Sequence, residues 1–404
     1  MDDIQPSAAV ILDKGKLTKD ELNTLGLIFE LGQATNAQIC DRLNLSLPSV
    51  NKILKQLQTA KLIQPGEQQG SSGGRRPSTV KLCPGLFYIV AVDIEVFGTR
   101  VAVYDNNLML QCQAEIPFTL TKSRDGLPRL ADQINAFISI NNYQRRQLIG
   151  ISFSIVGLID EKNGESCFYL RDEADGVPIR DYLQDLFSLP VTIHNDVNAA
   201  AQAELMFGEA KGKTDALVLS MDIGVGLGII LDGAVRKGAK GFSGEIGHIP
   251  MAQEGELCYC GKQGCLETVA SGSSLIKNAK QAIAAGQNTM LSQLCGHNPD
   301  HLQIAMVIEA ANKGDLFAIE LLSQVGSTMG RAISTMIQIF NPEIVILGGK
   351  IANAGQYMTL PMLQALNTYC MIQIREQTQI TVSKLGDNAK LLGVAYWGVK
   401  NFLR

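Results

Sequence analysis

Apolar residues in the first 62 positions recur every three or four residues, in three separate runs. Thr18 is a good N-cap for the first run, which ends at Gly32, and the second starts after Thr35. Ser46 caps the third run, which tolerates Pro48 in its first turn and stops near Ala60. The pattern predicts three short helices whose buried positions are Leu22, Leu25, Ile28, Phe29, Ile39, Leu43, Val50, Ile53, Leu54 and Leu57.

The last two of these helices are joined by a tight turn at Asn44-Leu45, which is the arrangement of a helix-turn-helix. Its second helix would carry hydrogen-bonding side chains on its polar face, where they can reach base edges in a major groove. These side chains, the predicted DNA contacts of the helix, are Ser49, Asn51, Lys52, Lys55 and Gln56.

A wing is predicted directly after the helix-turn-helix. Leu62-Ile63 and 79–82 read as two short strands, and the polar loop between them contains Gly-Gly-Arg75-Arg76-Pro. Glycines let a backbone lie close to a duplex, and an arginine on such a loop can enter a narrow minor groove. Taken alone, the loop is also compatible with a flexible linker, but its place after a helix-turn-helix favours DNA binding by Arg75 and Arg76.

Beyond Pro84-Gly85 the pattern changes to short apolar runs that alternate with helical stretches, which is typical of an α/β fold. Two similar cycles of strands predict two lobes, with ligands at the carboxyl ends of strands in the cleft between them. The expected strands are 88–93, 100–104, 111–118, 147–154 and 191–194 in the first lobe and 216–220, 226–231 and 343–347 in the second, with helices over 127–141 and 326–339.

Composition narrows the class of protein. With 404 residues, 46% hydrophobic and 18% charged, the chain is long enough for two or three domains and unlike a disordered or collagenous one. No run is apolar enough for a membrane span, and Met1-Asp2-Asp3 begins no secretory signal, so a cytoplasmic protein without membrane insertion is expected. The net charge is −4, yet residues 42–82 hold seven basic residues against one acid. Either a polyanion-binding module or a solvated basic surface would explain this local charge.

Three of the nine cysteines lie within eight residues, Cys258, Cys260 and Cys265, and His248 lies ten residues before the first. Three thiolates and one imidazole form a closed tetrahedral set, which suits structural zinc better than catalytic zinc because no coordination position stays open. We expect one Zn²⁺ per chain, which fixes a loop that also carries Glu245 and Glu267.

The stretch Gly-Glu245-Ile-Gly-His248-Ile, followed by Cys-x-Cys-Gly-x-x-Gly-Cys-Leu-Glu267, resembles the signature of the ROK family of sugar kinases and repressors. The resemblance extends over the body of the chain and, with a winged helix in front, is similar to the repressor branch that contains NagC-, Mlc- and XylR-like proteins. It implies an α/β, two-lobed, actin-like body with ribonuclease-H-like halves behind an N-terminal winged helix-turn-helix. The expected domains are 1–83, 84–195 and 196–404, with a return of the C-terminal helix to the first lobe as an alternative to its place in the second.

The resemblance also implies a sugar site. Asn195-Asp196 matches the kinase pair whose aspartate is the general base on a sugar hydroxyl, and Glu245, His248 and Glu267 match positions that contact sugar hydroxyls. The alternative is that these residues are inherited and support only the fold. The segment 168–177 lacks the Asn-x-x-Trp pattern of many sugar-binding members.

Both loops that hold ATP phosphates in the kinases of this family are altered. The first reads Asp93-Ile-Glu95-Val-Phe-Gly-Thr, and the second reads Met-Asp222-Ile223-Gly-Val-Gly-Leu-Gly, with bulky or acidic residues where bare backbone is needed. Carboxylates that face a triphosphate repel it. We therefore expect little or no ATP binding, no enzyme activity, and at most a vestigial kinase base at Asp196.

These observations predict a transcriptional repressor of carbohydrate uptake or metabolism genes that binds a palindromic DNA operator as a homodimer or homotetramer. The inducing signal is a sugar, a sugar phosphate or a transporter domain of the phosphotransferase system, since regulators of the family differ in this respect. The rival hypothesis is an ATP-dependent sugar kinase with an appended DNA-binding head, which the retained Asp196 favours.

Overall fold

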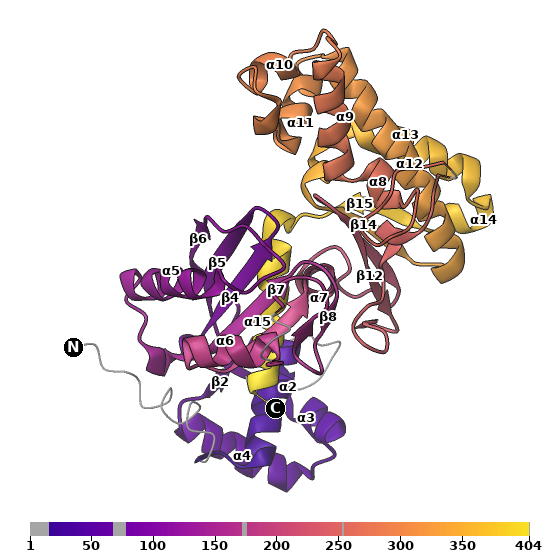
Figure 1. Ribbon diagram of the computed structural model, residues 1–404. Coiled ribbons are helices and arrows are strands. Elements are labelled where there is room, and N and C mark those ends of the chain that lie inside the picture. Colours follow the sequence, from indigo (N-terminus) through magenta and orange to yellow (C-terminus); the bar gives the residue numbers. More distant parts are fainter. Residues whose placement is uncertain (1–15, 68–77, 172–175, 253, 404) are drawn as a thin grey trace. The chain divides into compact units, whose positions relative to one another are not determined.

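The computed structural model describes residues 16–67, 78–171, 176–252 and 254–403. The chain folds into two compact units (Figure 1): unit 1 consists of residues 1–196 and 391–404, and unit 2 consists of residues 197–390. The segment up to residue 83, called the head below, thus belongs to the same unit as the sheet that follows it. The finer division at residues 83 and 195 stays a prediction.

The head of unit 1 contains the three helices that the apolar pattern predicts. They are α2 (Lys19–Leu31), α3 (Asn36–Leu43) and α4 (Leu47–Thr59). Each begins at the expected cap: Thr18 and Thr35 both form capping boxes, and the Ser46 hydroxyl accepts from the Ser49 amide. A small antiparallel sheet of order β1-β3-β2 completes the head, with β1 (Ala34–Thr35), β2 (Ile63–Pro65) and β3 (Thr79–Leu82).

The second part of unit 1 is a five-stranded sheet of order β10-β7-β4-β5-β6. β4 pairs antiparallel with β5 and parallel with β7, so the antiparallel strands β5 and β6 occupy one side of the sheet and the parallel strands β7 and β10 the other. All eight residues of β7 are buried, as expected for a strand covered on both faces. The strands are β4 (Tyr88–Glu95), β5 (Gly98–Asp105), β6 (Leu110–Ile116), β7 (Leu148–Ile155) and β10 (Val191–Asn195).

The remaining elements of unit 1 come between these strands along the chain. The helices are α5 (Leu127–Ile140), the 3-10 turn η2 (Arg145–Gln147) and α6 (Ile179–Phe187), and the short pair β8 (Ile159–Asp160) and β9 (Glu165–Ser166) forms a separate two-stranded sheet. Helix α7 (Asp196–Phe207) begins at the last residue of unit 1.

Unit 2 repeats the same sheet topology, in the order β13-β12-β11-β14-β15. Its first strand, β11, again pairs antiparallel with the next strand and parallel with a later one, and all of its residues are buried. The strands are β11 (Ala216–Met221), β12 (Val225–Leu231), β13 (Ala234–Val235), β14 (Ile344–Gly348) and β15 (Gln379–Val382). Two halves of equal topology agree with the predicted two-lobed body.

Helices make up most of the rest of unit 2. The long helix α12 packs along α13, and their shared apolar faces form much of the core of this unit. The helices are α8 (Leu266–Ala270), α9 (Gly272–Ala284), α10 (Leu291–Leu294), α11 (Ile304–Asn312), α12 (Leu316–Phe340), α13 (Gln356–Tyr369) and α14 (Ile372–Arg375), with 3-10 turns η3 (Ile246–His248), η4 (Pro299–His301), η5 (Lys350–Ala354) and η6 (Gly386–Asn388).

The C-terminal helix α15 (Ala389–Phe402) carries the chain from unit 2 back into unit 1, where it lies beside β4 and β7 (Figure 1). A Cβ at Gly398 would meet the Ile89 side chain, which shows how closely the helix approaches the sheet. Its last turns contact α2 of the head: the Tyr396 and Phe29 rings stack with centroids 5.3 Å apart, and Lys400 pairs with Glu30 at 2.8 Å.

Most predicted strands agree with the structure within two residues. The predicted helix over 326–339 is the second part of α12, which begins ten residues earlier, at Leu316. Within the described ranges, none of the helices is both long and apolar enough to cross a membrane.

Candidate functional site

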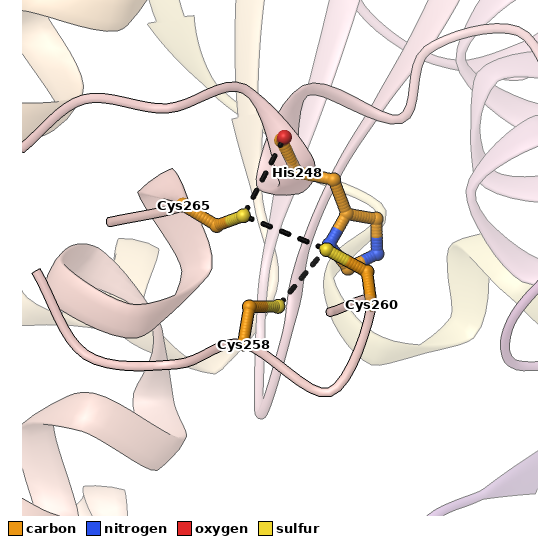
Figure 2. Close-up of side chains that lie close together, drawn as sticks. All are labelled: His248, Cys258, Cys260 and Cys265. Atoms are coloured by element: carbon orange, nitrogen blue, oxygen red, sulfur yellow. Dashed lines mark hydrogen bonds between the residues drawn. The ribbon is translucent and has the colours of Figure 1, made fainter. Parts of the chain in front are cut away.

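The cysteine cluster lies in the loop between β13 and α8 of unit 2, where His248 ends the turn η3 and Cys265 precedes α8 (Figure 2). Bridges between Pro250 and Cys265 and between Leu257 and Gln263 fold this loop back on itself. Gly261 and Gly264 have positive φ values of 86° and 70°, which give the chain the tight turns that direct the three sulfurs inward.

The geometry of this cluster fits zinc. The four ligand atoms of His248, Cys258, Cys260 and Cys265 all lie within 4.8 Å of one another. Two separations are 3.5 Å, from Cys258 Sγ to His248 Nδ1, and 3.6 Å, from Cys260 Sγ to Cys265 Sγ. Tetrahedral Zn²⁺ with Zn–S bonds of about 2.3 Å spans sulfur–sulfur edges of about 3.8 Å. The residues present therefore match a tetrahedral S₃N site.

Burial supports the same assignment. Cys258 and Cys265 are almost inaccessible to solvent, and burial raises the pKa of Cys265 to about 12 in the absence of a cation. A bound Zn²⁺ would supply the positive charge that lets this buried thiol lose its proton. With four protein ligands, the ion would hold the loop in place.

Tyr259 is a neighbour of this cluster that the sequence did not reveal. Its hydroxyl lies 3.0 Å from His248 Nε2, while the other ring nitrogen, Nδ1, is the one next to Cys258. A hydrogen bond at Nε2 fixes the ring orientation and leaves Nδ1 available as the ligand atom. A tyrosine between two cysteines carries no such signal in the sequence.

The predicted sugar residues of unit 2 lie around the same loop. Glu245 precedes η3, and its carboxylate lies 3.9 Å from His248 Nε2. Glu267 lies in α8, where its Oε2 accepts from the Val225 amide at 3.1 Å. Burial raises the pKa of Glu267, although the Val225 amide and His248 oppose this effect. The loop from Glu245 to Glu267 thus places two carboxylates and one imidazole within one short segment of the fold.

The other two predicted sugar residues belong to unit 1. Asn195 ends β10 and Asp196 begins α7, so both lie at the carboxyl end of a parallel strand, where α/β proteins bind ligands. The Asn195 amide donates to the Gly157 carbonyl at 3.0 Å and reaches Asp196 Oδ1 at 3.4 Å. Both side chains are largely buried, so their orientation is fixed by the local fold.

The first altered phosphate loop is the hairpin turn between β4 and β5. Asp93 is fully buried, and its Oδ2 lies 2.6 Å from an Arg100 nitrogen on the facing strand. The Ser154 hydroxyl donates to its other oxygen at 2.8 Å, and Glu95 pairs with the same arginine at 3.3 Å. Glu95, the carboxylate predicted to repel phosphate at this loop, is thus paired with Arg100 within the hairpin.

The second altered loop is the turn between β11 and β12. Here Asp222 accepts from the Lys350 amide at 2.8 Å and lies 3.3 Å from the Lys390 ammonium. Burial alone would raise the pKa of Asp222, but Lys390 and the Lys350 amide outweigh it and lower this pKa. The carboxylate is therefore ionised and paired with residues far away in the sequence.

The candidate DNA contacts on α4 are all exposed: Ser49, Asn51, Lys52, Lys55 and Gln56. They occupy the face opposite to Val50, Ile53, Leu54 and Leu57, which are buried in the head. Asn51 accepts from the Asn36 amide at 2.8 Å, and the Ser49 hydroxyl lies 2.9 Å from that of Ser46. Arg75 and Arg76 lie outside the described residues.

Comparison with known proteins assigns the class. The profile of the ROK family matches residues 89–401, which is most of the chain and all of both sheets of the body except one strand residue. The protein belongs to the ROK family.

Regulators of this family match beyond the body. The transcriptional dual regulator NagC of Escherichia coli K12 is 28% identical over 369 residues, which cover 91% of this chain and 89% of NagC. The crystal structure of a ROK family transcriptional regulator, a homologue of the E. coli Mlc protein, superposes with a TM-score of 0.78 at 25% identity. That match covers 95% of this chain and 96% of the regulator, so it includes the head.

Kinases of the family match the body at similar identity. The glucokinase of Halalkalibacterium halodurans is 31% identical over 320 residues, which cover 78% of this chain but 95% of the kinase. Almost the whole length of this kinase therefore matches the body of the chain. The match to the regulators extends over the head as well.

Proposed function

We propose that this protein is a sequence-specific transcriptional repressor of carbohydrate uptake or metabolism genes, and that it acts in the cytoplasm. The observation that carries this proposal is the helix-turn-helix geometry of the head, with five exposed polar side chains along α4, in a chain that regulators match over 91% and 95% of its length. A helix of this kind reads bases in a major groove, and lysines on it position the helix against phosphates.

The wing completes the proposed DNA interface. Strands β2 and β3 pair antiparallel beside the helices, so the loop that joins them starts and ends next to the head. Arg75 and Arg76 on that loop are proposed minor-groove contacts. A two-fold homodimer, or a tetramer built from two such dimers, would place two heads on a palindromic operator.

The inducer is proposed to bind at the residues matched to sugar contacts. Glu245 and Glu267 of unit 2 are acceptors for hydroxyl groups, and Asn195 with Asp196 of unit 1 supplies a second set. A sugar or sugar phosphate is the main hypothesis, and a transporter domain of the phosphotransferase system is the alternative. Sugars can be titrated calorimetrically into protein that binds its operator. If none of a panel of sugars gives a heat of binding, the transporter domain is favoured.

A structural zinc ion is proposed to fix the loop that carries Glu245 and Glu267. The ion would be held by His248, Cys258, Cys260 and Cys265, and it would supply the positive charge that keeps the cysteines as thiolates. Metal analysis of the purified protein should give about one zinc per chain. Cys260→Ser should lose most of it, whereas Cys167→Ser, an exposed cysteine outside the cluster, should keep it. Retention of zinc by Cys260→Ser would contradict the four-ligand assignment.

The experiment that tests the regulator is selection of genomic fragments by the purified protein at near-physiological salt, followed by sequencing. Moderate salt suppresses non-specific phosphate binding first, so a shared motif reports base recognition. The expected result is a palindrome upstream of transport or sugar-catabolic genes. No enrichment with folded, zinc-loaded protein would contradict the proposal.

Substitutions on α4 sharpen this test. Asn51→Ala should weaken binding to the selected operator by about 5- to 100-fold and relax specificity at one base position. Lys55→Ala should weaken binding to all sequences and reduce the salt dependence by about one charge. Gln58→Ala, an exposed residue of α4 outside the proposed set, is the matched control and should bind as the unaltered protein does.

The second candidate function is a sugar kinase with an appended head. Asp196, at the carboxyl end of β10, is the observation that favours it. Paired carboxylates in both phosphate loops oppose it, since a triphosphate would have to displace Asp222 from its lysine or approach Glu95. A coupled assay with ATP and a panel of hexoses and amino sugars separates the two. Turnover that Asp196→Asn abolishes would establish the kinase.

A further inference from the structure

We propose that Asn36, the first residue of α3, is a positioning residue for base recognition, and that Asn51, which it orients, recognises an adenine in each half of the operator. The observation behind this is a side-chain contact between the two helices of the helix-turn-helix. The inference rests on the proposed DNA binding, because it names the base that one residue of that interface contacts and the residue that fixes its side chain.

The contact joins the exposed face of α4 to the start of α3. The Asn36 side-chain amide donates to Asn51 Oδ1 at 2.8 Å, across 15 positions of sequence. Asn36 is partly buried, whereas Asn51 is exposed. The two helices pack against each other (Figure 1), and Ile39 of α3 and Val50 of α4 are both fully buried. The core of the head therefore sets the relative position of the two side-chain amides.

The capping box of α3 holds Asn36 in place. The Thr35 hydroxyl accepts from the Gln38 amide at 3.2 Å, and the Gln38 side chain accepts from the Thr35 amide at 2.9 Å. These bonds fix the first turn of the helix, to which Asn36 belongs. A donor at such a fixed position selects one of the two orientations of the Asn51 amide that differ by rotation of its terminal group.

The selected orientation leaves the groups that an adenine requires. An amide oxygen has two lone pairs, so Asn51 keeps one acceptor position and both N–H donors after it accepts from Asn36. In the major groove, adenine shows the N7 acceptor beside the N6 amino donor, and one asparagine amide can bond both. Guanine shows only acceptors along that edge and would leave the second lone pair of Asn51 without a partner.

The other polar residues at this end of α4 are suited to different tasks. Lys52 and Lys55 are exposed, and their ammonium groups attract phosphates without distinguishing bases. The Ser49 hydroxyl lies 2.9 Å from that of Ser46, which caps the helix. Asn51 is thus a neutral amide that is oriented before DNA arrives. Such preorganisation lowers the entropy cost of forming a specific contact.

The first test is made on the operator selected with the full-length protein. Each position of the half-sites is replaced in turn by the other base pairs, and affinities are compared at one salt concentration. One position should require an A·T pair, and any other pair there should weaken binding by about 5- to 100-fold. Asn51→Ala should abolish this preference and keep the others. A preference for guanine or cytosine at the position that depends on Asn51 would overturn the adenine assignment.

Asn36→Ala tests the positioning. It should reduce the discrimination at the same position by about 3- to 10-fold, because the Asn51 amide must then be ordered during binding. In combination with Asn51→Ala it should have no further effect. Asn36→Gln keeps a side-chain amide donor and should recover part of the discrimination. An unchanged preference in Asn36→Ala, or an equal loss of affinity with and without the Asn51 side chain, would overturn the role of Asn36.

Gln38→Ala is the matched control on the same helix. It removes the capping box and keeps the Asn36–Asn51 bond, so it should weaken binding to all operators alike and preserve the base preference. Loss of the preference in this variant as well would show that any disturbance of α3 has the same effect, against a specific role of Asn36. A protein that selects no DNA motif would contradict the proposed function itself, and this inference with it.

Discussion

The two hairpin turns that resemble phosphate loops differ in the sequence distance between a carboxylate and the basic residue that pairs with it. In unit 1, Asp93 on β4 pairs with Arg100 on β5, seven positions further along the same hairpin. In unit 2, Asp222 pairs with Lys390, which is 168 positions away. The two sheets have the same topology, so the difference lies in the turns and not in the scaffold.

The Asp93–Arg100 ion pair is therefore a local contact, whereas the Asp222–Lys390 ion pair is a long-range contact. The Asp93–Arg100 pair can form as soon as the β4–β5 hairpin forms, and its loss should weaken unit 1 alone. The Asp222–Lys390 pair requires the whole of unit 2 and the start of α15, so its loss should reach α15 as well. Substitutions at Asp93 and Asp222 test this difference directly, and substitutions at Glu267 and Lys400 test other charged groups of the two units.

The largest effect is expected from Asp93→Ala. Asp93 is fully buried and bonds both Arg100 and Ser154, so the substitution removes the 2.6 Å carboxylate partner of Arg100 and the acceptor of the Ser154 hydroxyl, at a cost of about 3 to 5 kcal/mol of unfolding free energy. Denaturant titration measures this loss. Glu95→Gln is the matched control: its carboxylate is more exposed, so about 1 kcal/mol or less is expected. Equal losses of unfolding free energy in both variants would show that the burial of Asp93 does not determine the cost of removing its carboxylate.

The second effect concerns acid. Lys390 and the Lys350 amide outweigh burial and lower the pKa of Asp222, so its contribution to stability is present above the ordinary value of 3.8 and is lost as the pH falls through the lowered value. Asp222→Asn should therefore be less stable than the unaltered protein at pH 6. The difference should shrink below about pH 4, as thermal unfolding across this range would reveal. A constant difference at every pH would mean that the ion pair contributes nothing.

Glu267→Gln should have the opposite sign. Burial is the main influence on the Glu267 carboxyl and raises its pKa, so the folded state favours the protonated form and the charged form costs stability at neutral pH. The glutamine keeps an oxygen for the Val225 amide and should stabilise unit 2 at pH 7 by about 0.5 to 1 kcal/mol. The gain should disappear as the pH falls below the ordinary value of 4.5, where the unaltered residue is neutral in both states. A loss of stability at pH 7 would show that the ionised carboxylate supports the fold.

The smallest effect is expected at the partly exposed pair between Lys400 of α15 and Glu30 of α2. Such pairs contribute about 0 to 1 kcal/mol, so Lys400→Met should change the melting temperature little. Tyr396→Ala, which removes the ring that stacks on Phe29, should cost more because it also removes buried area. A larger loss of stability from Lys400→Met than from Tyr396→Ala would show that the Lys400–Glu30 ion pair, and not packing of the rings, holds α15 against the head.

The local features of the fold were predictable from the sequence. Helices α2, α3 and α4 follow from apolar periodicity and from the caps Thr18, Thr35 and Ser46, because both signals act within a few residues. The metal cluster was predictable for the same reason, since its four ligands lie within 18 positions and their geometry agrees with zinc. Short strands such as β8, β9 and β15 carry too few residues for a pattern.

Long-range contacts were not predictable. Glu95 and Asp222 are predicted to repel phosphate, and no pattern in the sequence indicates that Arg100 and Lys390 pair with them. Arg100 faces Asp93 only through the strand register, and Lys390 reaches Asp222 only after unit 2 has closed. Tyr259 was missed because a hydrogen bond to a ligand histidine depends on the loop geometry alone.

The contact between α15 and α2 sets a practical limit on protein engineering. The head is formed by the first part of the chain, yet its helix α2 includes Gly26, Phe29 and Glu30, which face residues between Tyr396 and Leu403 at the other end. Exchange of heads between relatives at a single junction near residue 83 would pair each new α2 with a foreign α15. A functional chimera should need two junctions, so that both ends of the chain come from the same parent.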